Sequence, residues 1–124
     1  MGLNIICVGI GGFIGSVLRY LISIKCAKIF STFIPIGTLF VNVIGGILIG
    51  LIIHLSGNYN ITDNMKLLLT TGLMGGLTTF STFSLETINL FTSSNYLLGG
   101  VNIVLNVSLS LLGVVMGRYI GGLF

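Results

Sequence analysis

Residues 75–84 carry the side chains most able to do chemistry in this chain. The stretch reads Gly-Gly-Leu-Thr-Thr-Phe-Ser-Thr-Phe-Ser, so two glycines are followed by five hydroxyl groups and two aromatic rings. It lies in an apolar segment long enough to cross a bilayer, where a lipid-facing helix has no use for hydroxyl groups. Non-helical backbone is tolerated in a membrane only where protein buries it or where it lines a cavity. We therefore expect a helix that is broken near Gly75–Thr79 and forms the wall of a site or pore.

The aromatic and hydroxyl groups of this segment suit an anion. Phe80 and Phe83 are three residues apart, so they share a helical face, and they alternate with donors such as Ser81 and Thr82. A pair at this spacing is usually plain packing, but ring edges are electropositive and hydroxyls can donate to a dehydrated anion. A cation path would favour carbonyl or carboxylate rings. Glu86, the acidic residue of this apolar span, is either a functional group or the partner in a helix-end salt bridge.

Polar residues also interrupt the other apolar segments. Asn42 lies about two turns into one of them, where its amide either bonds another helix or offers two N–H donors to an anion. Asn102, Asn106 and Ser110 are spaced by four and form a stripe. Such a stripe either forms hydrogen bonds that hold helices together or is a hydrogen-bonding track along a permeation path. Arg19 is either a snorkelling interfacial residue or a cation at a wide pore mouth.

The composition is that of a membrane protein. Of the 124 residues, 54% are hydrophobic and 6% are charged, whereas soluble domains carry about 25% charged residues. A spanning helix needs about 20 mostly apolar residues, so the uncharged stretches accommodate four helices. We expect an all-α protein of one domain, residues 1–124, in the plasma membrane. The four predicted spans are residues 3–24, 36–55, 65–92 and 96–121.

Enzymatic chemistry and nucleic-acid binding are not indicated. The sequence has no paired carboxylates, no cluster of metal-ligating side chains, and no nucleophile with a base at a recognisable spacing. The net charge of +3 comes from a few lysines and arginines near the ends of the apolar stretches. In a membrane protein these residues report on orientation rather than on binding to nucleic acid.

The balance of positive charge leaves the orientation open. Four spans place the N-terminus, the 56–64 loop and the C-terminus on one side, together with Lys66 and Arg118. The opposite side carries Arg19, Lys25 and Lys28. Because orientation follows the excess of Lys and Arg on the cytoplasmic side, two readings remain. Either the first loop is cytoplasmic by a small margin, or the chain inserts both ways and pairs as an antiparallel dimer.

A homo-oligomer is expected because one four-helix unit has too little interior to enclose a conduit. The helices carry glycine pairs four residues apart, which let backbones approach closely in lipid, but spacing does not tell whether they pack within or between subunits. Freed carbonyls at a broken helix can coordinate a hard cation such as Na⁺, and two breaks meeting at a two-fold axis would form one four-oxygen site. The glycine pairs are Gly11/Gly15, Gly46/Gly50, Gly72/Gly76, Gly113/Gly117 and Gly117/Gly121.

Over nearly its whole length the chain resembles the Fluc (CrcB) family of fluoride channels. Four blocks carry the resemblance, the third being highly specific and the others supporting it by order and spacing. They are Gly11-Gly12-x-x-Gly15-x-x-x-Arg19-Tyr20, Gly37-Thr38-Leu-x-Val-Asn42, Gly72-x-x-Gly75-Gly76-Leu-Thr78-Thr79-Phe80-Ser81-Thr82-Phe83-Ser84-x-Glu86, and the polar segment that contains Asn102, Asn106 and Ser110.

The resemblance implies a dual-topology antiparallel homodimer with two fluoride pores and passive export of F⁻. It further implies an aromatic box and a structural Na⁺ at the dimer centre. In this implied arrangement Asn42 is a pore donor, Arg19 a vestibule cation, and the polar track contains Ser81, Thr82 and Ser110. Phe80 and Phe83 form the box, and the backbone carbonyls of Gly75 and Thr78 bind the Na⁺.

The principal alternative is a small dual-topology antiporter that exchanges protons for drug cations. It shares the size, the helix count and the balanced charge. Such a carrier needs a membrane carboxylate, and here the candidate is Glu86, which follows a run of hydroxyls rather than an aromatic cage. A non-transporting assembly subunit is a third class, and it would leave the hydroxyls of residues 75–84 without a purpose.

Overall fold

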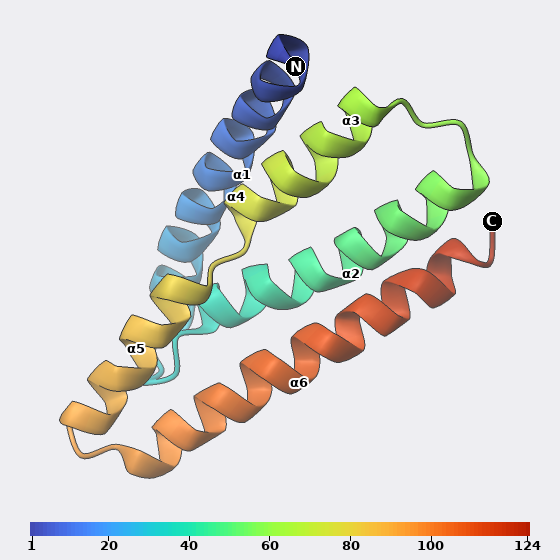
Figure 1. The fold of residues 1–124 in the computed structure, drawn as a ribbon. Helices are drawn as coiled ribbons and strands as arrows, with labels where there is room; N and C mark the ends of the chain where they lie inside the picture. The colour runs from blue at the N-terminus through green and yellow to red at the C-terminus, as the bar shows by residue number, and fades with distance from the viewer.

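Helices account for all the regular structure of the protein. A computed structural model describes all of residues 1–124, and Figure 1 shows its ribbon. In chain order the elements are α1 (Gly2–Ile29), α2 (Ile36–Asn58), α3 (Asp63–Leu67), η1 (Leu68–Met74), α4 (Gly75–Leu77), α5 (Phe80–Thr92) and α6 (Tyr96–Gly121). The predicted all-α fold is confirmed.

Three of the helices, α1, α2 and α6, are long and apolar enough to cross a membrane. Helix α6 has the predicted bounds, whereas α2 ends at residue 58 rather than 55 and α1 at residue 29 rather than 24. The extension of α1 has a physical reason. Lysine is a good helix former, and Lys28 lies in the last turn, where a cation interacts favourably with the helix dipole. The charges that end an apolar span therefore do not end the helix.

The predicted span 65–92 is divided among four elements, from α3 to α5. Thr78 and Thr79 have extended backbone, with ψ angles of 158° and 121°, between α4 and α5. This interruption confirms the predicted break near Gly75–Thr79 and narrows it to two residues. The turns before it, η1, are wound as a π-helix, a geometry that occurs frequently at functional sites.

The break is stabilised locally by Thr79. Its side-chain oxygen accepts the N–H of Thr82 at 3.2 Å, which is the hydrogen bond expected of a threonine at a helix N-cap. The same oxygen lies 3.1 Å from the Thr82 hydroxyl. The helix therefore restarts at Phe80 because Thr79 satisfies a backbone donor that would otherwise be unpaired.

Glycines allow two close helix contacts within the subunit. Helix α1 packs along η1 and α4, and α2 packs along α6 (Figure 1). A Cβ atom at Gly15 would overlap the carbonyl oxygen of Leu73, and one at Gly117 would overlap that of Ile47. The spacing of the glycine pairs left open whether they pack within or between subunits. The structure assigns these glycines to contacts inside one subunit.

The chain ends and the connections lie at two opposite ends of the helical layer (Figure 1). The N-terminus, the connection between α2 and α3, and the C-terminus lie at one end, where the Tyr59 hydroxyl donates to the carbonyl of Phe124 at 3.2 Å. The α1–α2 and α5–α6 connections lie at the other end. The N-terminus, the 56–64 loop and the C-terminus are therefore grouped at one end, as the sequence predicted.

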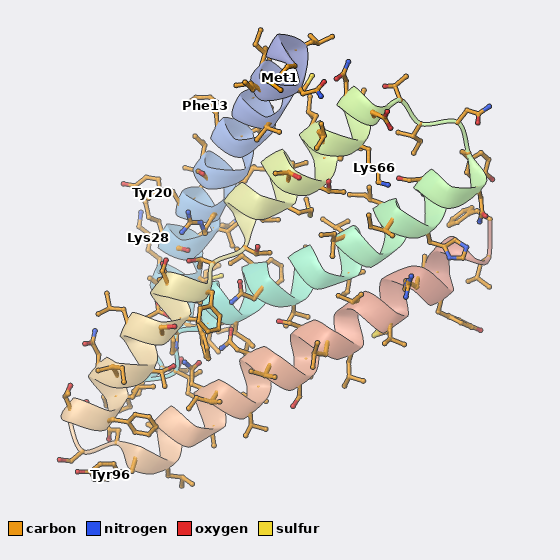
Figure 2. The ribbon with its side chains drawn as sticks, viewed as in Figure 1. Met1, Phe13, Tyr20, Lys28, Lys66 and Tyr96 are labelled. Atoms are coloured by element: carbon orange, nitrogen blue, oxygen red, sulfur yellow. The ribbon has the colours of Figure 1, made fainter.

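Most of the large apolar side chains point away from the subunit. The buried core is small and is centred on Val41, Met74 and Leu77. Figure 2 shows Phe13 and Tyr20 projecting outward from α1, and they are 72% and 65% exposed. A soluble monomer rarely exposes so much contiguous apolar surface, so this surface suits lipid or another subunit.

Candidate functional site

A cavity of about 440 Å³ lies where α2, the broken helix and α6 meet. Four of the predicted pore residues line it: Asn42, Phe80, Phe83 and Ser110. It is also lined by Gly75 and Thr78, the two residues predicted to bind Na⁺. The other lining residues are Gly45, Gly46, Ile49, Thr70, Met74, Thr79, Asn106, Val107, Leu111 and Val114. None of the lining side chains is charged.

The two phenylalanines of this cavity form an adjacent pair. Their ring centroids are 5.5 Å apart and the ring planes are tilted by 57°. Phe83 is buried, with 7% of its surface exposed, whereas Phe80 is 78% exposed. One ring is therefore fixed inside the subunit, and the other stands at its surface, where a second molecule can cover it.

Ser110 contributes an unpaired hydroxyl to the cavity. Its Oγ is buried and has no hydrogen-bond partner in the subunit. A buried polar atom without a partner is costly, and most serines in helices avoid the cost by donating to a carbonyl one turn back. The hydroxyl of Ser110 is thus free to donate to a ligand in the cavity.

Asn42 holds the helix break in place. Its Oδ1 accepts the N–H of Thr79 at 2.8 Å, and its Nδ2 donates to the carbonyl of Thr79 at 3.1 Å. The same Nδ2 donates to Oδ1 of Asn106 at 3.0 Å. Of the two roles that the sequence left open for Asn42, the structure shows bonding to other helices. A role as an anion donor stays a prediction.

The carbonyls of Gly75 and Thr78 lack the amide partners that a continuous helix would give them. In an α-helix the N–H of residue i+4 bonds the carbonyl of residue i, so these partners would be Thr79 and Thr82. The N–H of Thr79 donates to Asn42 instead, and that of Thr82 donates to the Thr79 side chain. Two backbone oxygens beside the cavity are therefore suited to a hard cation such as Na⁺.

Arg19 and Thr82 lie at a second cavity, of about 270 Å³, together with Thr38 and Thr79. Thr79, in the extended backbone of the break, lines both cavities and so lies between them. Arg19 is half-buried, and its Nε donates to the carbonyl of Gly76 at 3.0 Å. The guanidinium thus satisfies another carbonyl freed by the break, a role that the sequence did not suggest.

Glu86 and Ser81 lie outside both cavities. Glu86 lines a separate hollow of about 330 Å³ near Pro35, and its Oε1 accepts the hydroxyl of Thr38 at 2.9 Å. Its Oε2 is buried without a partner, so the salt bridge considered for it does not form in the subunit. Ser81 is exposed, with its hydroxyl 3.5 Å from that of Thr79.

Two threonines of the site were not singled out as candidates from the sequence. Thr79 caps α5 and binds Asn42, and its place in the run of hydroxyl residues that follows the two glycines was the available signal. Thr87 is buried and bonds the carbonyl of Phe83 at 2.7 Å. Its spacing of four residues from Phe83, in the same helix, gave no sign that Asn102 of α6 also bonds it.

Comparison with known proteins places these features in a family. The CrcB-like protein family, also described as Camphor Resistance, matches residues 6–118. The chain is 55% identical to the fluoride-specific ion channel FluC of Clostridium novyi over 94% of this chain and 91% of the relative. It is 57% identical to the protein of the same name from Clostridium perfringens, over 90% and 88%. For the FluC protein of Shewanella oneidensis the identity is 46%, over 93% of both chains. The chain, with its broken helix and uncharged cavity, therefore belongs to the CrcB-like family.

Proposed function

We propose that this protein is a fluoride-selective channel of the plasma membrane that lets F⁻ leave the cell passively. Its close relatives carry the name of fluoride-specific channels. The observation that carries the proposal is the free hydroxyl of Ser110 in an uncharged cavity that Phe80 and Phe83 also line. A pore must replace the ion's hydration shell, and a hydroxyl with ring edges can replace that of an anion.

The cavity suits an anion better than a cation. Its lining contains no carboxylate, and Glu86, which the antiporter alternative requires, lines a different hollow. An antiporter needs its carboxylate where the cation binds, because proton and cation compete for that charge. The separation of Glu86 from the cavity therefore favours the channel over the antiporter.

The pore is proposed to form between two antiparallel subunits, each crossing the membrane four times. In this arrangement α3, η1, α4 and α5 together make the third crossing. The exposure of Phe80, at 78%, supports a partner that covers the ring. The nearly equal numbers of Lys and Arg residues on the two sides support insertion in both orientations. Two equivalent pores per dimer follow from the two-fold symmetry.

Along each proposed pore, polar groups follow one another from the mouth to the rings. Arg19 at the second cavity attracts anions into the mouth, and Ser81 and Thr82 offer hydroxyls along α5. Asn42 is the proposed amide donor at the main cavity, which this residue lines. Because a pore must release the ion as well as bind it, the uncharged donors between the mouth and the rings suit conduction better than further fixed positive charges would.

A structural Na⁺ is proposed at the dimer centre, held by the carbonyls of Gly75 and Thr78 from both subunits. When bound, the ion supplies the positive charge that balances the carbonyl dipoles. The support is that neither oxygen has its helical amide partner. Such an ion would link the two helix breaks and so stabilise the dimer.

Removing Na⁺ is expected to weaken the dimer. At a Na⁺ concentration ten times its Kd, linkage predicts that replacement by N-methyl-d-glucamine lowers the assembly constant by about tenfold. Exchange of subunits between differently labelled dimers, at equal ionic strength, measures this effect. Equal exchange rates in the two cations would argue against a Na⁺ site at the break.

The proposed function is tested by growth of a bacterial strain that lacks its own fluoride exporter. Expression of this protein is expected to restore growth at fluoride concentrations that stop the parent strain, with no gain in resistance to lipophilic drug cations. Resistance to the drug cations without resistance to fluoride would favour the antiporter instead.

A further inference from the structure

A chain of hydrogen bonds crosses the subunit between the helix break and α5. Asn42 Nδ2 donates to Asn106 Oδ1 at 3.0 Å, and Asn106 Nδ2 donates to Asn102 Oδ1 at 3.0 Å. Asn102 Nδ2 donates to Thr87 Oγ1 at 2.9 Å, and Thr87 Oγ1 donates to the carbonyl of Phe83 at 2.7 Å. We call these four side chains, Asn42, Asn106, Asn102 and Thr87, the asparagine ladder.

Both ends of the ladder hold parts of the main cavity. At one end Asn42 bonds the N–H and the carbonyl of Thr79, in the extended backbone of the break. At the other end Thr87 bonds the backbone of Phe83, whose ring lines the same cavity. The ladder therefore fixes α5 and the break against α2 and α6, and it does so around one cavity.

Asn102 and Thr87, the two members of the ladder nearest to α5, do not line that cavity. Asn102 is completely buried and Thr87 is 4% exposed, and neither is among the lining residues. Each donor in the ladder is directed to the next acceptor, so a change at Thr87 removes the partner of Asn102. Without that partner the Asn102 amide is free to turn away from Asn106, whose Nδ2 then keeps within the ladder only its bond to the backbone carbonyl of Asn102, at 3.0 Å.

Simple adhesion between α5 and α6 would need only the bond from Asn102 to Thr87. The two further bonds, from Asn106 to Asn102 and from Asn42 to Asn106, extend the network to α2 and the break. Buried polar networks of this kind fix one arrangement when every member is satisfied. Each of the three carboxamides has hydrogen-bond partners within this network, which are the neighbouring carboxamides, Thr79, Thr87 and, for Asn106, also the backbone carbonyl of Asn102.

We propose that Asn102 and Thr87 are positioning residues that set the placement of the Thr79 backbone and of Asn42 at the cavity. They act through Asn106 and touch no ion themselves. This inference rests on the proposed function, because it takes the cavity as part of the fluoride path. It assigns to two residues outside the path a share in fluoride conduction and selectivity.

The test compares Thr87→Val, which keeps the shape of the side chain, with Thr87→Ser, which keeps the hydroxyl. Thr92→Val is the matched control, since the Thr92 hydroxyl bonds only the carbonyl of Asn89 within its own helix. Thr87→Val leaves the Asn102 Nδ2 donor without its partner. A tenfold change in rate corresponds to about 1.4 kcal/mol, which lies within the cost of leaving a buried donor unpaired. Thr87→Val is therefore expected to slow fluoride efflux about tenfold in assembled dimers. Thr87→Ser and Thr92→Val are expected to keep the wild-type rate and the wild-type preference for fluoride over chloride.

Hydrogen exchange at the Thr79 amide separates positioning from adhesion. That amide donates to Asn42, at the far end of the ladder from Thr87. Thr87→Val is expected to accelerate its exchange, measured by NMR in micelles, while Thr92→Val leaves it unchanged. Wild-type efflux for Thr87→Val, or unchanged exchange at Thr79, would overturn the proposal.

Asn102→Leu is the second variant, because it breaks the same bond from α6. If neither Thr87→Val nor Asn102→Leu assembles, the ladder serves folding alone and the proposal is overturned. If the wild-type protein releases no fluoride, the proposed function fails. The exchange rate at Thr79 then still tells whether the ladder holds the break.

Discussion

Replacing Phe80 or Phe83 by isoleucine is expected to reduce fluoride efflux about tenfold each while the dimer stays assembled. Isoleucine keeps an apolar side chain but has no electropositive ring edge. Contacts between aromatic rings are worth up to about 1.5 kcal/mol. We take the same value for a ring edge that faces an anion, and it corresponds to about tenfold in rate. The two rings belong to one pair, with centroids 5.5 Å apart, so the double variant is expected to be slower than either single one.

Phe80→Ile is the cleaner of the two variants. Because Phe80 is 78% exposed in the subunit, its replacement changes the packing inside the subunit little beyond the contact with Phe83. Phe13→Ile is the matched control, because Phe13 is 72% exposed on α1 and is not a lining residue of the main cavity. Wild-type efflux from a correctly assembled Phe80→Ile/Phe83→Ile dimer would remove the aromatic pair from the mechanism.

Gly117→Ala is expected to destabilise the subunit strongly. A Cβ atom at this position would overlap the carbonyl oxygen of Ile47 and lie 2.8 Å from its carbonyl carbon and from the N of Leu51. All three atoms are backbone, so no rotamer change relieves the overlap. We expect a loss of about 3 kcal/mol, at the upper end of the cost of overpacking, because α2 and α6 would have to separate.

Gly100→Ala, on the same helix, is the control for this prediction. A Cβ atom there would meet nothing within 4 Å, and alanine is the better helix former. The variant is therefore expected to be as stable as the wild type or slightly more stable. Unfolding in mixed micelles of increasing denaturing-detergent fraction measures both variants. Equal stability of Gly117→Ala and Gly100→Ala would contradict the close packing of α2 on α6.

Much of the fold was predictable because lipid imposes simple rules on sequence. Apolar length predicted α6 with its correct bounds, and the paired glycines and hydroxyls predicted the break. The sequence did not predict that η1 is a π-helix or that α1 continues to Ile29. Both features depend on contacts with neighbouring helices and on helix-end energetics, which hydropathy does not report.

Part of the lining of the main cavity was predictable from the sequence, but the hydrogen bonds among its residues were not. Asn42, Phe80, Phe83 and Ser110 do gather at one cavity, whereas Glu86 lies at another hollow and bonds Thr38. The stripe of Asn102, Asn106 and Ser110 was visible from its spacing. It is divided in the structure, because Asn102 bonds Thr87 while Ser110 is left unpaired. Which amide meets which partner depends on the register of α6 against two other helices, and one chain's spacing cannot supply that register.

The central claim, selective and passive fluoride conduction, is tested most directly by anion efflux from proteoliposomes. Fluoride and chloride electrodes would follow release from vesicles loaded with both anions, with a K⁺ ionophore present to carry the counter-ion. The proposal predicts rapid fluoride release that depends on the ionophore, with chloride retained. Retention of both anions by well-assembled dimers, or release of both at equal rates, would contradict it.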